Sequence, residues 1–152
     1  MGNFLKGTYT PVNPEKYVGK GLPYFRSSWE KRCFYYFDMN NNVLEWASEN
    51  IAISYYYPLD GKDHRYYPDI YCKVKKKDGG TATYIIEIKP YAQSVKPKPP
   101  KKKTAKAMRN YNNARQVVLK NEFKWKAAEA FCRKKGFSFK VLTEKQIFSN
   151  DR

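Results

Sequence analysis

The spacing of hydrophobic residues changes several times along the chain, and each change predicts a new structural element. The sequence Ser-Ser-Trp-Glu at residues 27–30 has the form of a helix-capping box. Cys33, Phe34 and Phe37 follow at the three- and four-residue spacing of one helical face. Three consecutive asparagines at residues 40–42 are typical of a turn. The segment between these two signals is therefore expected to form an amphipathic helix.

Runs of β-branched and aromatic residues follow this helix and predict strands. A short strand is expected at residues 43–46 and a second at residues 51–57. The turn sequence Pro-Leu-Asp-Gly separates the second run from residues 65–75, so these two runs are expected to pair as a hairpin. Residues 81–89 contain a nearly continuous apolar run, which is typical of a strand that is buried on both faces.

The last third of the chain combines an irregular basic segment with helical patterns. Residues 90–121 contain no Asp or Glu, and the Lys- and Pro-rich sequence at residues 96–103 is incompatible with a helix or an inner strand. The elements expected after it are helical sequence from about residue 104, a second helical pattern at 122–135 that ends at Gly136, a strand at 138–142 and a short helix starting at 143. This order of helix, strands, helices and strand describes one α/β sheet domain rather than a bundle or a sandwich.

The length of 152 residues fits one domain. Residues 1–25 are rich in Gly, Pro, Tyr and Lys and show no periodicity, so they are expected to form an extended arm that packs on the domain. Residues 26–148 are expected to form the domain itself, with a basic Pro/Lys-rich loop at about residues 91–104.

Positive charge dominates the composition. Thirty Lys and Arg residues against fourteen Asp and Glu give a net charge of +16 and a pI of about 9.7. Such an excess favours binding to the phosphates of a nucleic acid. The residues expected to contact DNA are Lys96, Lys98, Lys101, Lys102, Lys103, Lys106, Arg109 and Arg115. Because nothing in the chain resembles a base-reading module, little sequence specificity is expected.

Two further features exclude other classes of function. No stretch approaches ~20 apolar residues and the N-terminal sequence lacks the apolar segment of a secretory signal, so we expect a soluble protein made in a cytoplasm, without membrane contact. Cys33, Cys72 and Cys132 are widely spaced and His64 is the only histidine, so a structural zinc site lacks ligands. The cysteines are expected to be buried and reduced.

Three charged residues carry the candidate chemistry. Asp69 follows a proline at the start of one expected strand, and Glu87 and Lys89 lie on the next. Residues two apart on a strand point to the same face, so Glu87 and Lys89 share one side of the sheet while the isoleucines between and before them face the other. Carboxylates on neighbouring strands are the ligands that a hard cation such as Mg²⁺ needs for phosphodiester hydrolysis. A charged pair in an apolar strand costs energy unless it is used or paired.

Pro68-Asp69 and the sequence Glu-Ile-Lys at residues 87–89 resemble the motif of the PD-(D/E)xK nuclease superfamily. Glu30, in a helix ahead of the sheet, resembles the additional acid of TnsA-like transposon endonucleases, and the likeness extends over residues 26–147. The chain is most similar to the head-completion nuclease family of T4-like tailed bacteriophages. The segments that carry this likeness are Asn-Pro-Glu-Lys-Tyr at 13–17, Arg-Ser-Ser-Trp-Glu at 26–30 and Glu-Ile-Lys-Pro at 87–90.

The resemblance implies a restriction-endonuclease-like α/β core, in which helices flank a mixed sheet with an antiparallel hairpin. It implies a metal-dependent endodeoxyribonuclease whose catalytic residues are Glu30, Asp69, Glu87 and Lys89. The three acids would hold Mg²⁺, for which Mn²⁺ substitutes, and Lys89 would assist the attacking water. The substrate would be double-stranded DNA in a phage head after packaging, the partners would be portal or head–neck proteins, and the location would be the host cytoplasm during assembly and then the virion. The oligomeric state and the number of metal ions stay open.

Some of these residues also have ordinary structural interpretations. Glu30 could merely close the capping box by accepting a hydrogen bond from the Ser27 amide. Glu87 and Lys89 could form a surface ion pair, which contributes little to stability. Glu49 is a rival acid that we assign to a loop or the surface.

Two other functions compete with the nuclease. A non-catalytic DNA-binding or capsid-plugging protein could retain the nuclease-like fold, but it has no need of all four candidate catalytic residues. A ribosomal-type RNA-binding protein would not need an acidic cluster, because carboxylates repel phosphate unless a metal intervenes.

Overall fold

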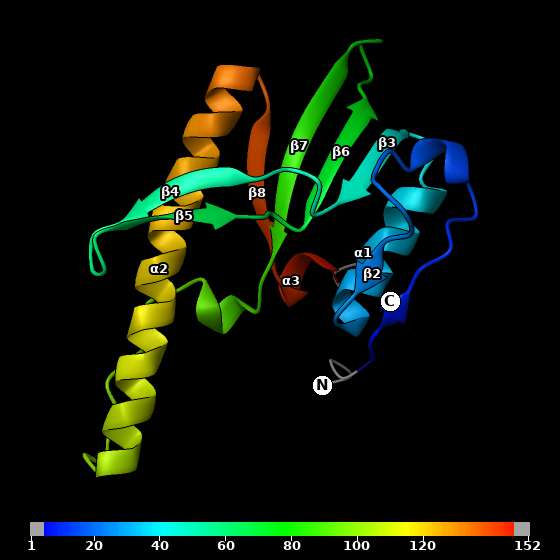
Figure 1. The fold of residues 1–152 in the computed structure, drawn as a ribbon. Coiled ribbons are helices and arrows are strands. Elements are labelled where there is room, and N and C mark those ends of the chain that lie inside the picture. Colours follow the sequence, from blue (N-terminus) through cyan, green and yellow to red (C-terminus); the bar gives the residue numbers. More distant parts are fainter. Residues whose placement is uncertain (1–4, 148–152) are drawn as a thin grey trace.

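A four-stranded mixed sheet lies at the centre of the computed structural model, which describes residues 5–147 (Figure 1). Its strands are, in order across the sheet, β3 (Val43–Ser48), β6 (Ile70–Lys75), β7 (Thr81–Ile88) and β8 (Ser138–Leu142). The β3–β6 and β6–β7 pairs are antiparallel, and β8 runs parallel to β7. The expected α/β fold with a mixed central sheet is confirmed.

Helix α1 (Ser28–Met39) covers one face of this sheet. Cys33, Phe34 and Phe37 are buried, as their spacing predicts, and they pack around Trp46 of β3. The Phe34 and Trp46 ring centroids are 5.4 Å apart. The Ile86 and Ile88 side chains join this core, which leaves Glu87 on the opposite face of the sheet.

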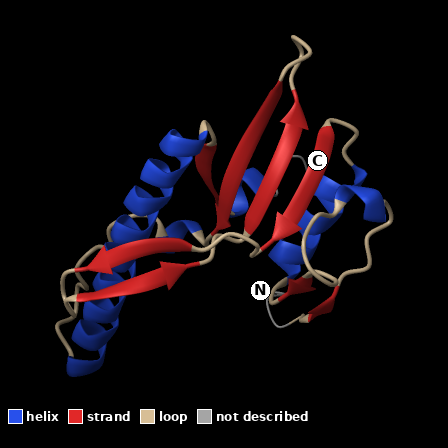
Figure 2. Ribbon diagram, turned by 45° about the horizontal axis from the view of Figure 1, so that its top comes forward, coloured by secondary structure: helices blue, strands red, loops and turns tan. Residues whose placement is uncertain are grey.

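The predicted hairpin between residues 51–57 and 65–75 is wrong in its second half. Strand β4 (Ile53–Tyr57) pairs only with β5 (Lys62–Tyr66), and these two strands form a separate ribbon that lies across α2 (Figure 2). The chain leaves the ribbon at Pro68, which has no amide hydrogen to donate to a strand partner. It then enters the central sheet as β6, so residues 65–75, which were predicted to form one strand, belong to two different sheets.

Helix α2 (Ala105–Lys135) is one continuous helix of 31 residues where the sequence suggested two helical patterns. No Gly or Pro interrupts it, and Asn121 at the expected junction is buried, with its side-chain amide donating to the Gln93 carbonyl. Thr104 caps its start, and Gly136 ends it in the left-handed conformation with φ 75°, as predicted. The C-terminal half packs on the ribbon and β8, whereas the N-terminal half projects away from the sheet (Figure 1).

The segments outside this core are short. The expected irregular loop lies between η2 (Tyr91–Gln93) and α2, and α3 (Glu144–Ile147) follows β8 as predicted. Within residues 5–147, no helix combines the length and apolar character needed to cross a membrane.

The N-terminal segment packs against α1 and β3. Strands β1 (Gly7–Thr8) and β2 (Tyr24–Phe25) pair with each other, and η1 (Pro14–Lys16) lies between them. Tyr9 is buried, and the Tyr17 ring lies edge-on to Trp46 at 4.7 Å between centroids. The division of the chain into an arm (1–25) and a domain (26–148) stays a prediction, and its residues 1–4 and 148 lie outside the described residues.

Asp38 holds this segment in place. Its side chain is fully buried and accepts hydrogen bonds from the Tyr9 hydroxyl (2.6 Å), the Val12 amide (2.7 Å) and the Asn13 amide (2.9 Å). Burial by itself raises the pKa of the Asp38 carboxyl, but these hydrogen bonds more than offset that effect, so the pKa lies below its ordinary value. The ionised carboxylate therefore stabilises the folded chain.

Replacing Asp38 with Asn is expected to lower the free energy of unfolding by about 3 kcal/mol, because the carboxylate accepts hydrogen bonds that a neutral amide cannot replace. Urea denaturation at neutral pH measures this loss, and Asp63→Asn on the exposed ribbon is the matched control. The wild-type stabilisation is present above about pH 4, the pKa of an unfolded Asp, and is lost as the pH falls through the lowered folded pKa. Equal stability of both variants would show that Asp38 does not anchor the segment.

Candidate active site

Asp69 and Glu87 meet at one end of the central sheet. Ile70 of β6 pairs with Ile86 of β7, so Asp69 stands opposite Glu87 in the antiparallel register. Side chains opposite each other in such a pair are close neighbours. The Ile88 amide donates to the Asp69 carboxylate at 2.7 Å and holds it in this position. The backbone pairing of two strands therefore brings two of the predicted catalytic acids together.

The two acids form a like-charged pair in a poorly solvated place. Only 4% of Glu87 is exposed. Burial and the neighbouring Glu87 carboxylate raise the pKa of Asp69 well above its ordinary value, against the opposing effects of the Ile88 amide and Lys89. The Lys89 ammonium lies 3.9 Å from the Glu87 carboxylate, on the same side of the sheet as predicted. This arrangement is costly unless a cation balances the charge.

Glu30 approaches the pair from the first turn of α1. Its amide donates to the Ser27 hydroxyl at 3.2 Å, which confirms Ser27 as the N-cap. Its carboxylate accepts from the Arg26 amide at 2.6 Å, and not from the Ser27 amide as a standard capping box would have it. Burial raises the pKa of Glu30, the Arg26 amide opposes this shift, and the nearby Asp69 carboxylate adds to it. Glu30 thus shares the electrostatic environment of Asp69.

Glu49, which the sequence interpretation assigned to a loop or the surface, also borders this site. It follows β3, and its amide donates to the Asp69 carbonyl at 3.1 Å. Its backbone has φ 48°, unusual for a residue with a side chain. The carboxylate pairs with the Arg26 guanidinium, whose pKa is raised by Glu49 first and also by Glu30 and Asp69. Arg26 is therefore a cation shared among the acids.

The sequence interpretation missed the residues that α2 and the ribbon contribute. Tyr66, at the end of β5, is 4% exposed, and its hydroxyl lies near Glu87 and Trp125 but makes no hydrogen bond of good geometry with a residue among 5–147. The Lys124 ammonium lies 5.5 Å from the centre of the Tyr66 ring. Burial and Lys89 lower the pKa of Lys124, while Glu87 and Asp69 oppose this shift. No local pattern marks these residues, because only the packing of α2 on the ribbon brings them to the carboxylates.

The residues present fit a divalent cation held mainly by oxygen ligands. Within residues 5–147, no three Asp, Glu, His or Cys side chains lie close enough together to form a complete metal-binding group. Mg²⁺ is commonly held by one or two carboxylates and keeps several waters. Asp69 and Glu87 supply such a pair, and the unpartnered Tyr66 hydroxyl beside them calls for a further polar group.

The eight Lys and Arg residues predicted to contact DNA lie away from this pair. All eight side chains are exposed, on the loop before α2 and on the N-terminal half of that helix. His64 lies on the ribbon, where its ring nitrogen is 2.7 Å from the Asp60 carboxylate.

A family described as TnsA-like endonuclease N terminal matches residues 40–144. The chain belongs to the TnsA-like endonuclease family. The head completion nuclease of Enterobacteria phage T4 is 36% identical to it over 140 residues, which cover 91% of this chain and 90% of that protein. The predicted likeness to both groups is confirmed. The matched segment of this TnsA-like endonuclease includes Asp69, Glu87 and Lys89, and the roles of these residues stay predictions.

Because Asp69 and Glu87 repel each other, removing the charge of one of them is expected to stabilise the folded protein. A carboxyl with a raised pKa binds its proton more tightly when folded, so ionised Asp69 costs stability increasingly as the pH rises from about 4 towards that raised pKa. Asp69→Asn keeps an acceptor for the Ile88 amide and is expected to raise the free energy of unfolding by about 1 kcal/mol at neutral pH in EDTA.

Thermal unfolding of both proteins in EDTA checks this expectation, with the exposed Glu129→Gln on α2 as the control for removing one negative charge. A destabilised Asp69→Asn would mean that the two carboxylates do not repel each other in the folded protein.

Proposed function

We propose that this protein is a Mg²⁺-dependent endonuclease that hydrolyses phosphodiester bonds of DNA during completion of a bacteriophage head. The observation that carries the proposal is the Asp69–Glu87 pair, with Lys89 on the same side of the sheet and 3.9 Å from Glu87. Membership of an endonuclease family and the name of the T4 relative support it.

Asp69 and Glu87 bind the ion, and Mn²⁺ substitutes for Mg²⁺. When bound, a divalent ion polarises a phosphoryl oxygen and lowers the pKa of a bound water. The Ile88 amide keeps the Asp69 carboxylate oriented, and the buried Tyr66 hydroxyl is available to donate a hydrogen bond to a group bound in the site. Lys89 orients the attacking water and places positive charge beside the phosphoryl oxygens.

Glu30 does not form a group of three metal ligands with Asp69 and Glu87 within residues 5–147, so it contributes through the water of the metal site, and Arg26 positions it. The Arg26 amide holds the Glu30 carboxylate while its guanidinium holds Glu49. This arrangement keeps a third acid beside Asp69 without leaving its charge unbalanced.

Double-stranded DNA binds through its phosphates. The exposed cations of the loop and α2 displace counterions along the backbone, which supplies affinity without reading sequence. The prolines among the lysines restrict the loop, so less conformational entropy is lost when it clamps DNA.

The likeness to the T4 head completion nuclease supports a place of action in the assembly of a phage head. The protein acts in the host cytoplasm on a DNA-filled head, next to portal or head–neck proteins. A non-catalytic plug or DNA-binding protein is the competing function. It gains nothing from a buried pair of like charges, which lowers stability in the absence of a bound cation.

Incubation of plasmid DNA with the wild-type protein and Mg²⁺ or Mn²⁺ is expected to produce nicked and linear DNA, and EDTA should abolish the reaction. Asp69→Ala, Glu87→Ala and Lys89→Ala should each lower the cleavage rate by at least about 100-fold, because each removes a ligand or a charge on which the transition state depends. Gel electrophoresis measures the rate, and fluorescence anisotropy measures DNA binding.

DNA binding should persist in these variants. Changing Lys101, Lys102 and Lys103 together to Ala is the complementary variant: it should weaken binding and its salt dependence while leaving the catalytic residues intact. DNA binding without cleavage under every metal condition would contradict the nuclease and support the non-catalytic alternative.

In the phage that encodes the protein, Glu87→Ala is expected to cause accumulation of DNA-filled heads without tails, because trimming of the packaged DNA then fails. Electron microscopy of lysates and the titre of infectious particles measure this effect, and wild-type protein supplied in the same cells is the control. Normal titres with the inactive variant would place the essential role elsewhere than in cleavage.

A further inference from the structure

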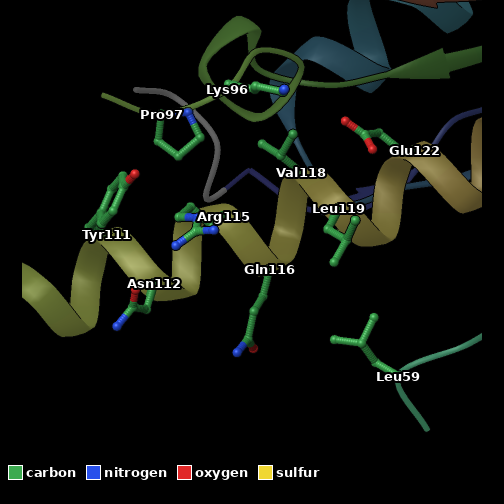
Figure 3. Close-up of a pocket in the computed structure, with 10 residues that line it drawn as sticks. All are labelled: Leu59, Lys96, Pro97, Tyr111, Asn112, Arg115, Gln116, Val118, Leu119 and Glu122. Carbon is green, nitrogen blue, oxygen red and sulfur yellow. The ribbon is translucent and has the colours of Figure 1, made fainter. Parts of the chain in front are cut away.

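A groove of about 710 Å³ lies along the projecting half of α2, apart from the carboxylates of the active site (Figure 3). The loop before the helix contributes Lys96 and Pro97, and Leu59 of the ribbon turn borders the other side. The helix supplies the remaining lining residues, among them Tyr111, Arg115, Gln116 and Leu119. Glu122 is the one acid in the lining, against the two cations Lys96 and Arg115. None of the four predicted catalytic residues lines this groove.

The lining has the composition of a nucleotide-binding surface. The Tyr111 ring and the Leu119 side chain offer aromatic and apolar surface on which a base can stack. Arg115 and Lys96 supply positive charge for phosphate, and the Arg115 guanidinium lies 5.5 Å from the Tyr111 ring centre. The Gln116 amide can donate to and accept from the edge of a base. The volume falls in the range of small-ligand pockets.

A double helix can place only its phosphates against such a groove, because its bases are stacked and paired inside the duplex. An unpaired strand exposes both the faces and the edges of its bases. The alternative occupant, a second copy of this chain, is disfavoured because each copy carries a net charge of +16. Charge and lining chemistry therefore favour a single DNA strand.

One row of side chains connects the groove to the active site. Asn112, Gln116, Lys120 and Lys124 follow one another at intervals of four residues, which places them on a single ridge of the helix. The first two line the groove, and the Lys124 ammonium lies beside the Tyr66 ring, close enough to the carboxylate pair to feel its charge. Lys120 comes between them along the helix, and its ammonium is 5.6 Å from the Tyr57 ring centre. From Gln116 to Lys124 the helix rises about 12 Å, which matches roughly three nucleotides at ~3.4 Å per stacked base.

We propose that this groove binds an unpaired nucleotide of the substrate and that the Gln116–Lys120–Lys124 row leads the attached strand to the Asp69–Glu87 pair. The favoured substrate is then DNA with a single-stranded segment next to the cut, such as a tailed or forked end. This inference rests on the proposed nuclease function and names the class of DNA on which it acts.

The test compares a labelled blunt duplex with the same duplex carrying a single-stranded tail. Fluorescence anisotropy in EDTA measures binding without cleavage, and the result of interest is the ratio of the two affinities. The wild-type protein is expected to prefer the tailed DNA. Tyr111→Leu should lower that preference by roughly fivefold or more, because the stacked base loses its aromatic platform. Tyr35→Leu, an equally drastic change at an exposed tyrosine on α1, should keep the wild-type ratio.

Equal affinities of the wild-type protein for both DNAs, or a wild-type ratio in Tyr111→Leu, would overturn the groove assignment while leaving cleavage of plasmid DNA in place. Absence of cleavage with any metal would overturn the nuclease function instead, and a Tyr111-dependent preference for tailed DNA would still identify the groove as a DNA site. A melting temperature of Tyr111→Leu equal to that of the wild type ensures that the lost preference reflects the groove.

Discussion

The antiparallel pairing of β6 with β7 forces Asp69 and Glu87 to stand side by side, and the organisation of the site depends on this constraint. Backbone hydrogen bonds along the two strands offset the destabilising repulsion between the two neighbouring carboxylates. The Ile88 amide, Lys89 and Lys124 then moderate the electrostatic cost without removing it. The folded chain thus stores an unfavourable interaction that a divalent cation can relieve.

The layers on either side of the sheet complete the site from different parts of the chain. The start of α1 brings Glu30, the segment just before it brings Arg26, and the C-terminal half of α2 brings Lys124 and Trp125. Aromatic packing around Trp46 fixes the first helix, and packing of α2 on the ribbon fixes the second. A change in either hydrophobic layer therefore alters the electrostatics of the carboxylates without touching them.

Features that depend on neighbours in sequence could be predicted from the sequence. The shared face of Glu87 and Lys89 follows from the period of a strand, and Ser27 and Gly136 mark helix ends through their own backbone requirements. Short motifs predicted membership of an endonuclease family, and the folded sheet brings the residues of these motifs together.

Features that depend on packing could not be predicted in this way. The apolar patterns on either side of Asn121 predicted two helices, although α2 continues through this residue. Local periodicity does not show that the Asn121 side chain can be buried in the middle of a helix, where its amide donates a hydrogen bond. The run through Pro68 read as one strand, although its halves bury their side chains in different clusters. Tyr66 and Lys124 became visible only once the ribbon lay across α2.

The unbroken length of α2 has a mechanical consequence. A helix of 31 residues spans about 46 Å, and its capped ends and lack of glycine or proline leave no joint at which it can bend easily. Its anchored half fixes the direction of its projecting half, so the backbone positions of the cations on this half keep constant distances from the carboxylates. The rigid helix therefore fixes the distance between its projecting half and the carboxylate pair. A polymer bound along the helix would reach the pair at that fixed distance.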